Sequence, residues 1–314
     1  MMNKIEQEVL VSIIMPAYNA ANYIQEAIDS VINQTFLGWE LIIVDDGSTD
    51  HTKEFITKNV LVNERIHYYY QKNGKQGKAR NLAISKSKGT YLAFLDADDL
   101  WIPKKLEMQL LEIVEKNVDL VFSDSYIFST QQHADSNNRM NTINSFLQGD
   151  EALKLLLVGN RIPHLTVLAK KEKIIAAGGF TTIKNIQNAE DYHLWLKLLI
   201  DGCTFYGSDK TLAYYRVHED SSTFQDKYAT DQVIEALFDL LNQNPNLSCM
   251  IVKALKQEFK KQSSKCHSQT DFAIFIDKNC TYLGKMFYAP FYKVLNYFVG
   301  VKNTRRFLNR FLNA

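Results

Sequence analysis

Phe94-Leu95-Asp96-Ala97-Asp98-Asp99-Leu100 joins a short apolar run to three carboxylates, and this junction indicates the fold of the chain. Residues 91–95 are apolar over a length that suits a buried strand, which should end where the acids begin. Open α/β sheets bind their ligands beyond such strand ends. Acids this close repel one another unless a cation shares them, and oxygen ligands suit Mg²⁺ or Mn²⁺. The alternative is a solvated acidic turn before a helix that starts near Pro103.

Strands and helices are predicted to alternate through the first third of the chain. Apolar runs of strand length are separated by segments that carry apolar residues at helical spacing. The predicted strands are 9–15, 41–44, 66–70 and 91–95, and the predicted helices include 23–34 and 79–86. This alternation predicts an α/β fold with a mainly parallel central sheet flanked by helices.

Polar residues follow three of these strands. They are Pro16, Tyr18 and Asn19 after the first, Asp45 and Asp46 after the second, and Asp96, Asp98 and Asp99 after the fourth. Parallel strands end at one edge of their sheet, so we expect these groups to converge there. Together with the basic loop 71–81, they describe a pocket for a nucleoside diphosphate. Neither Gly-x-Gly-x-x-Gly nor a P-loop motif follows the first strand, which disfavours a dinucleotide cofactor and P-loop ATP hydrolysis.

Composition bounds the class of protein. The 314 residues suit one large or two modest domains. With 36 basic and 35 acidic residues the net charge is +1, which argues against a nucleic-acid binder that works through bulk charge. The polar segment 1–8 lacks the core of a signal peptide, so a cytoplasmic location is expected. The four cysteines are scattered, which suggests neither a zinc site nor a disulfide framework.

Four motifs in sequence order resemble those of the family-two inverting glycosyltransferases, which have the type-A fold. The motifs are residues 12–19 (Ser-Ile-Ile-Met-Pro-Ala-Tyr-Asn), 44–50 (Val-Asp-Asp-Gly-Ser-Thr-Asp), 77–83 (Gly-Lys-Ala-Arg-Asn-Leu-Ala) and 94–99. The resemblance implies that the loop of Pro16, Tyr18 and Asn19 packs on the nucleobase. It implies Asp46, or else Asp45, at the base or ribose, and Arg80 near the base or phosphates. It also implies Asp96 at the ribose and Asp98 at a metal ion, with Asp99 nearby.

Two later stretches extend the resemblance. Glu190-Asp191, before an apolar helix, is similar to the acidic pair at the acceptor site, which implies Asp191 as the catalytic base and Glu190 beside the donor. Such a base takes the proton from the attacking hydroxyl. The alternative is a pair of acids that stabilises the first helical turn. Residues 213–218 resemble the Tyr-Arg-x-His end of the catalytic core, which implies Arg216 at the diphosphate and His218 at the metal or diphosphate.

The expected domains are a catalytic domain over 1–225, with a nucleotide-binding half (1–102) and an acceptor-binding half (103–225), and a helical extension over 226–314. No acid follows Asp277, whereas basic and aromatic residues recur to the C-terminus. This composition favours a segment that lies on an anionic membrane surface. The alternatives are a helical pair packed on the catalytic core and a dimer interface.

The resemblance therefore implies an inverting transferase that uses Mn²⁺ or Mg²⁺. It would move a hexose or N-acetylhexosamine from a UDP-sugar to a hydroxyl of a glycan acceptor, with a lipid-linked acceptor placing it at the membrane. The product would be a bacterial surface polysaccharide or lipo-oligosaccharide. Two alternatives stay open: a phosphoryl-transfer enzyme with Asp96 as nucleophile beside Mg²⁺, and a non-catalytic protein that binds nucleotide sugars.

Overall fold

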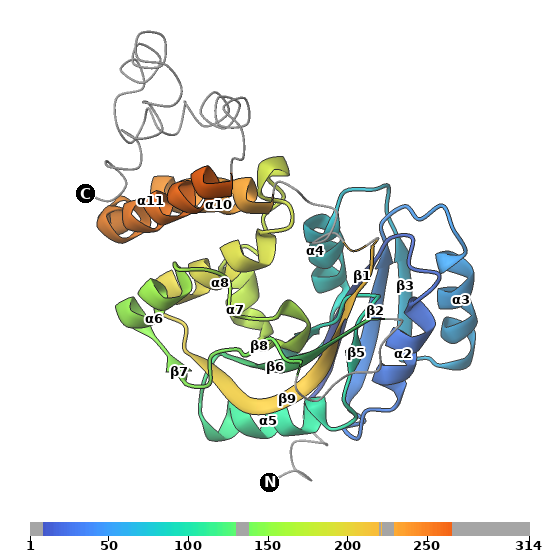
Figure 1. The fold of residues 1–314 in the computed structure, drawn as a ribbon. Helices are drawn as coiled ribbons and strands as arrows, with labels where there is room; N and C mark the ends of the chain where they lie inside the picture. Colours follow the sequence, from blue (N-terminus) through green and yellow to red (C-terminus); the bar gives the residue numbers. More distant parts are fainter. Residues whose placement is uncertain (1–8, 130–137, 220, 222–228, 266–314) are drawn as a thin grey trace. The chain divides into compact units, whose positions relative to one another are not determined.

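The structure, a computed structural model, describes residues 9–129, 138–219, 221 and 229–265 (Figure 1). It forms two compact units, one within residues 1–227 and one that starts at residue 228. The first contains a nine-stranded sheet with helices on both faces. The described part of the second contains helices α10 (Ala229–Gln243) and α11 (Ser248–Lys265).

Four parallel strands form the N-terminal half of the sheet in the order β3-β2-β1-β4. The strands are β1 (Val11–Ala17), β2 (Trp39–Asp45), β3 (Ile66–Tyr70) and β4 (Tyr91–Phe94). The connecting helices are α2 (Ile24–Ile32), α3 (Thr52–Val62) and α4 (Gln76–Lys86). Crossovers between parallel strands are right-handed. The path from β1 to β3 therefore puts α2 and α3 on one face, and the return to β4 puts α4 on the other, as Figure 1 shows.

β1 runs through Pro16, although a proline interrupts strand hydrogen bonding. The carbonyl of Ile14 accepts from the backbone N–H of Leu95 on the β4 side, and the pairing with β4 ends at Ile14. The backbone N–H and C=O of residues two apart in a strand point toward the same neighbouring strand. The missing N–H of Pro16 is therefore on the β4 side, where β4 has already ended and no hydrogen bond is lost. Pro16 is opposite Val44 of β2, and β1 begins and ends two residues later than the predicted strand 9–15.

The C-terminal half of the sheet is mixed. β8 (Leu168–Lys170) lies antiparallel between β4 and β6 (Leu120–Ser129), and β9 (Phe205–Val217) runs parallel to β6. Two short strands, β5 (Leu100–Trp101) and β7 (Phe146–Leu147), pair antiparallel with β9. The α/β class is thus confirmed, but the parallel arrangement is confined mostly to the first half, because β8, β5 and β7 all pair antiparallel with their neighbours.

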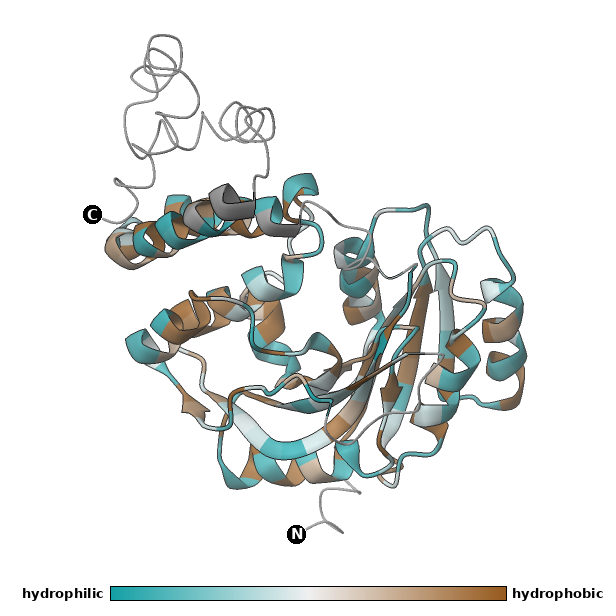
Figure 2. Ribbon diagram, viewed as in Figure 1, coloured by the Kyte–Doolittle hydropathy of each residue, from teal (hydrophilic) through white to brown (hydrophobic). Residues whose placement is uncertain are grey.

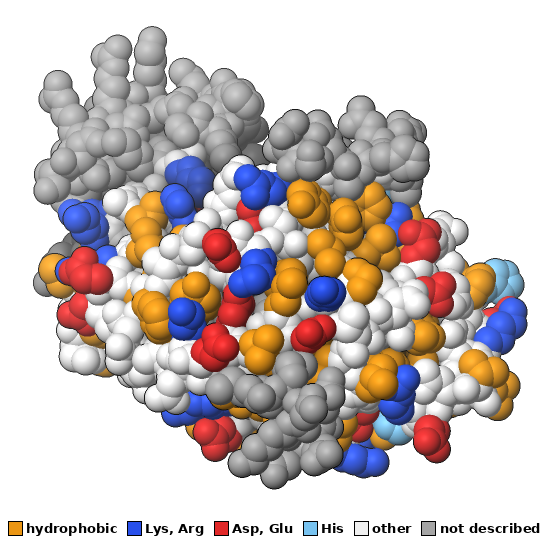
Figure 3. All heavy atoms as spheres, turned by 90° about the horizontal axis from the view of Figure 1, so that it is seen from below, with side chains coloured by type: hydrophobic (Ala, Val, Ile, Leu, Met, Phe, Trp, Pro, Cys, Tyr) orange, Lys and Arg blue, Asp and Glu red, His pale blue; other side chains and the backbone are white. Residues whose placement is uncertain are grey.

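The remaining helices of the first unit are α5 (Lys105–Glu115), α6 (Gly149–Leu156), α7 (Lys171–Ala176) and α8 (Glu190–Ile200). The central strands are apolar on both faces, and Figure 2 shows their hydrophobic colour between helices of mixed character. Seen from below, the described surface in Figure 3 carries acidic and basic side chains interspersed with apolar ones.

No described helix combines the length and the apolar character that a membrane span requires. The C-terminal segment for which membrane contact is predicted lies outside the described residues.

Candidate active site

The pairing of β5 with β9 brings the acidic turn to the end of β9. The antiparallel register places Leu100 opposite Tyr214, so the residues before Leu100 meet those after Tyr214. The backbone N–H of Arg216 donates to Asp99 Oδ1 at 2.8 Å, and His218 Nε2 lies 3.0 Å from Asp98 Oδ2. Two motifs that are more than a hundred residues apart in the chain therefore form one cluster.

The guanidinium of Arg216 is buried behind this cluster. Its Nε donates to the Asp98 carbonyl at 2.7 Å, its Nη2 donates to Glu26 Oε2 at 2.8 Å, and the Phe128 ring lies 4.6 Å away. These contacts orient the acidic turn. Arg216 thus supports the turn of Asp98 and Asp99 through its Nε. Its contact with a diphosphate stays a prediction.

The acidic turn concentrates negative charge. Burial raises the pKa of Asp99 well above its ordinary value, and the charges of Asp98 and Asp96 raise it further. A carboxylate and an imidazole are donors that Mn²⁺ accepts, and the remaining ligands of such an ion can come from a diphosphate. The donor pair of Asp98 and His218 therefore fits a divalent ion. Within the described residues, no set of three or more His, Cys, Asp and Glu forms a complete metal site.

Asp45 and Asp46 are both buried at the end of β2. Asp46 Oδ1 accepts from Gln71 Nε2 and from the N–H of Gly74, both at 2.7 Å, and its Oδ2 accepts from the N–H of Lys75 at 2.8 Å. Lys75 has a φ of 72°, a conformation that side chains disfavour, so Asp46 holds a strained loop in place. The structure thus shows Asp46 bracing the loop that leads into α4. A contact with a base or ribose stays a prediction.

Asp45 and Asn19 fix the neighbouring loops. Asp45 accepts from the N–H of Ser48 at 2.8 Å and from the hydroxyl of Tyr68 at 3.1 Å. Burial and the Asp45 charge raise the pKa of Tyr68 to about 12. Asn19 Oδ1 accepts from the N–H of Thr49 at 2.9 Å, which ties the β1 loop to the β2 loop.

Beside these loops, Tyr18 keeps 52% of its surface exposed at the sheet edge where a nucleobase is predicted.

Arg80 links α4 to the end of β4 and to the start of α8. It is buried in α4, where Nη2 donates to Asp96 Oδ1 at 2.7 Å and Nη1 donates to Glu190 Oε1 at 2.5 Å. Burial acts to lower the pKa of Arg80, but Asp96 and Glu190 hold it above its ordinary value. The end of β4 and the start of α8 are therefore connected by one guanidinium. Arg80, Asp96 and Glu190 were predicted as separate members of the site, and the structure joins them in one ion-pair network.

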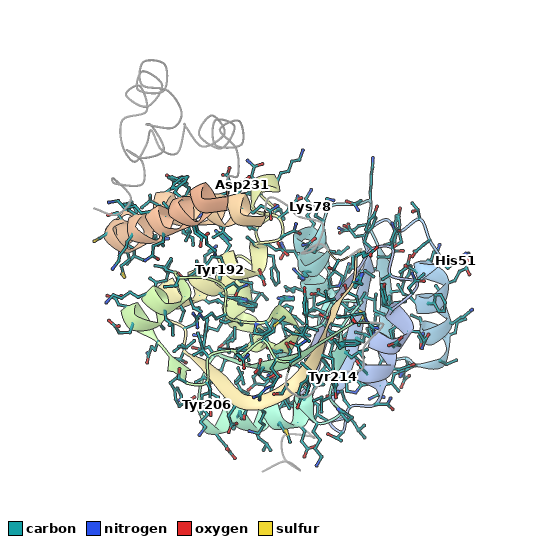
Figure 4. The ribbon with its side chains drawn as sticks, viewed as in Figure 1. His51, Lys78, Tyr192, Tyr206, Tyr214 and Asp231 are labelled. Carbon is teal, nitrogen blue, oxygen red and sulfur yellow. The ribbon has the colours of Figure 1, made fainter. Side chains whose placement is uncertain are left out.

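Asp191 follows Glu190 in the first turn of α8 and is half-buried. Its Oδ2 accepts from Asn160 Nδ2 at 3.2 Å, and its Oδ1 accepts from the N–H of Tyr192 at 2.6 Å. Burial raises the pKa of Asp191 to about 7, with a further contribution from the Glu190 carboxylate. Tyr192, labelled in Figure 4, donates its hydroxyl to the carbonyl of Leu156 at 2.8 Å and so fixes α8 on α6.

A cavity of about 710 Å³ brings part of the predicted site together. The predicted residues in its lining are Arg80, Asp96, Asp99, Glu190 and Asp191. The other predicted residues, which the lining does not include, are Pro16, Tyr18, Asn19, Asp45, Asp46, Asp98, Arg216 and His218. These lie at the neighbouring strand ends or against the acidic turn.

The rest of the lining was not predicted as part of the site, and it includes Arg139, Asn160, Arg161 and His164. The His164 ring is buried 4.8 Å from that of Phe94 and 5.9 Å from that of Trp195. Burial lowers the pKa of His164 well below its ordinary value, and the charge of Arg80 adds to this effect, so the imidazole is neutral. None of the four belongs to a local motif that could have identified it.

Comparison with known proteins identifies the family. The sequence profile described as "Glycosyl transferase family 2" matches residues 12–171. The "Putative teichuronic acid biosynthesis glycosyltransferase TuaG" of Bacillus subtilis (strain 168) is 38% identical over 213 residues, which cover 68% of this chain and 81% of TuaG. The "UDP-Glc:alpha-D-GlcNAc-diphosphoundecaprenol beta-1,3-glucosyltransferase WfgD" of Escherichia coli is 35% identical over 199 residues, 61% of this chain and 70% of WfgD.

Among solved structures, S. aureus TarS 1–349 in complex with UDP-GlcNAc matches with a TM-score of 0.63 at 19% identity, over 85% of this chain and 80% of TarS. This likeness confirms the type-A glycosyltransferase fold. The matched motifs and the shared fold agree: the chain belongs to glycosyl transferase family 2.

Proposed function

We propose that this protein transfers a hexose or an N-acetylhexosamine from a UDP-sugar to a hydroxyl of a glycan acceptor, with inversion at the anomeric carbon. The observation that carries the proposal is Asp191, a carboxylate with a pKa of about 7 in the same cavity as Asp96 and Asp99. A general base works best when its pKa lies near the operating pH. The names of WfgD and of the TarS complex contain UDP-glucose and UDP-GlcNAc, which supports a UDP-sugar donor.

In the proposed reaction the acceptor hydroxyl donates a hydrogen bond to the Asp191 carboxylate. As the hydroxyl oxygen bonds to the anomeric carbon, its proton passes to Asp191, and the bond from that carbon to the phosphate oxygen breaks with its electron pair leaving on UDP. Attack opposite the leaving group inverts the configuration. Asn160 and the N–H of Tyr192 hold the two carboxylate oxygens in place during this step.

Asp98 and His218 are the residues that would hold Mn²⁺ or Mg²⁺, with Asp99 beside them. When bound, such an ion neutralises charge that develops on the leaving diphosphate. Arg216 keeps the acidic turn in position for this role through its contact with the Asp98 carbonyl.

The proposed donor site extends from this turn to the ends of β1 and β2. There Tyr18 would stack on the base, between Pro16 and Asn19, and Asp46 would shape the loop beside it. Asp96 would meet the ribose, on the side that Arg80 leaves open. Bacterial surface-glycan synthesis, a lipid-linked acceptor and a cytoplasmic location belong to the same proposal.

Measuring UDP release from a panel of UDP-sugars, with and without Mn²⁺, tests the reaction and identifies the donor. Asp191→Asn should keep its affinity for UDP and lose transfer. Asp201→Asn, at the exposed far end of α8, is the control and should transfer normally. Transfer by the Asp191→Asn protein at the normal rate would exclude Asp191 as the base. Attachment to membranes stays a prediction, which deletion of residues 278–314 followed by sedimentation with membranes would test.

A further inference from the structure

Two arginines in the cavity lining have no charged partner among the residues that the structure describes. Arg139 and Arg161 are both exposed, and neither guanidinium makes an ion pair or hydrogen bond within the described part of the chain. The other cavity arginine, Arg80, is buried and donates through Nη1 and Nη2 to two carboxylates. The exposed pair therefore offers two free positive groups to whatever enters.

Arg161 lies on the acceptor side of the site. It directly follows Asn160, whose side-chain amide donates to Asp191 Oδ2 at 3.2 Å. The Asn160 side chain also accepts from the backbone N–H of Ile162 at 3.2 Å, so the segment that carries Arg161 is folded against the proposed base. Arg161 and Asp191 therefore line the same cavity, and Arg161 is adjacent in the chain to a residue that contacts Asp191.

Arg139 comes from a different segment with a fixed backbone. It forms a bridge to Tyr126 of β6, and the neighbouring N–H of Met140 donates to the carbonyl of Ser125 at 3.1 Å. Its Cα position is therefore set by the sheet. Two segments that are 22 residues apart in the numbering thus each place one guanidinium on the same cavity.

The other charged groups in the lining indicate which kind of ligand Arg139 and Arg161 would bind. Four acids line the cavity. Asp96 and Glu190 pair with Arg80, and Asp99 accepts from the backbone N–H of Arg216. The fourth, Asp191, is the group that must receive a proton. A neutral sugar needs neither free guanidinium, whereas a carboxylate or phosphate matches the planar fork of an arginine with two parallel hydrogen bonds. The expected site of the donor diphosphate is the cluster of Asp98 and His218, and neither residue lines this cavity.

We propose that the acceptor is anionic and that Arg139 and Arg161 bind its negative group, a carboxylate of a uronic sugar or a phosphate, close to the hydroxyl that Asp191 deprotonates. This inference rests on the proposed function, because it takes Asp191 to mark the acceptor site. Both sources of charge share the chemistry that the arginines recognise, and the choice of probe separates them.

The test measures binding to the full-length protein without donor, by calorimetry. The probes are methyl glucuronide, N-acetylglucosamine 1-phosphate and the neutral methyl glucoside. We expect one anionic probe to bind and the neutral one to bind at least tenfold more weakly, in line with the strength of charge-assisted hydrogen bonds. Arg139→Gln and Arg161→Gln should each weaken the anionic probe on the order of tenfold. Lys53→Gln, on the exposed surface of α3, is the matched control and should not change binding.

Kinetics supply the second readout. In both arginine variants the KM for the acceptor should rise while the KM for the UDP-sugar stays constant. Equal binding of the neutral probe, binding of no probe, or a rise confined to the UDP-sugar KM would each overturn the inference. If anion binding depends on the two arginines but no UDP-sugar is turned over with any acceptor, the proposed function fails and the anion site stands.

Discussion

Replacing Arg80 by Met tests how much the buried ion-pair network contributes to folding. The substitution keeps an unbranched apolar stem in α4 and removes the charge that joins Asp96 to Glu190. Only 6% of the Arg80 side chain and 4% of the Glu190 side chain are exposed, whereas 32% of the Asp96 side chain is. The Glu190 carboxylate would therefore stay buried without a counter-charge, while water would partly solvate Asp96.

Removing one partner of a buried pair costs about 3–5 kcal/mol, because the other charge is left uncompensated. Water screens the charge of Asp96, so Asp96 contributes less to this cost than Glu190 does. The expected loss in the free energy of unfolding is therefore about 3–4 kcal/mol. With a urea slope of about 2–3 kcal/mol per molar, the unfolding midpoint should fall by roughly 1–2 M. Adding Glu190→Gln to Arg80→Met removes the stranded charge and should recover about 1–2 kcal/mol of this loss.

The assay is urea unfolding followed by tryptophan fluorescence, since Trp195 is fully buried. Lys154→Met is the control, because it breaks an ion pair with Glu151 in which both side chains are mostly exposed. That control should leave the midpoint in place. If Arg80→Met shifts the midpoint no more than Lys154→Met does, or if the double variant is less stable than Arg80→Met alone, the network does not stabilise the contact of α4 with α8.

Three further predictions concern the base, the helix contact and the donor loop. Activity should rise with pH through about 7 as Asp191 loses its proton. Glu190→Gln should move this limb of the kcat/KM profile to lower pH, because it removes a negative charge that raises the pKa of Asp191. A limb that does not move would refute this. Gly77→Ala should lower the thermal midpoint despite the better helix propensity of alanine, since its Cβ would lie 2.7 Å from the carbonyl oxygen of Thr181; an unchanged or higher midpoint would show that α4 can shift. Asp46→Ala should lose about 3 kcal/mol of unfolding free energy and raise the KM for UDP-sugar, because three donors of the 71–75 loop lose their acceptor; normal values of both would show that the loop is held otherwise.

The early strands and their acidic ends could be predicted because their signals are local. A run such as Tyr91–Phe94 is apolar over strand length and is followed at once by carboxylates, and β3 has the predicted bounds. The parallel order of the first four strands follows from the alternation of strands with helices. The short antiparallel strand β8 has no such signal, since three residues between β4 and β6 leave no periodic pattern.

The sequence by itself determined the family, the type-A fold and the residue types gathered at the sheet edge, because each resides in a contiguous motif. Only the tertiary structure decided which of those residues meet. Arg80 finds Glu190 across 110 residues, Arg216 turns to Glu26 across 190, and Arg139 and Arg161 come to one cavity from separate segments. Such partners are chosen by how the packed elements place side chains in space, and no spacing along the chain records that choice.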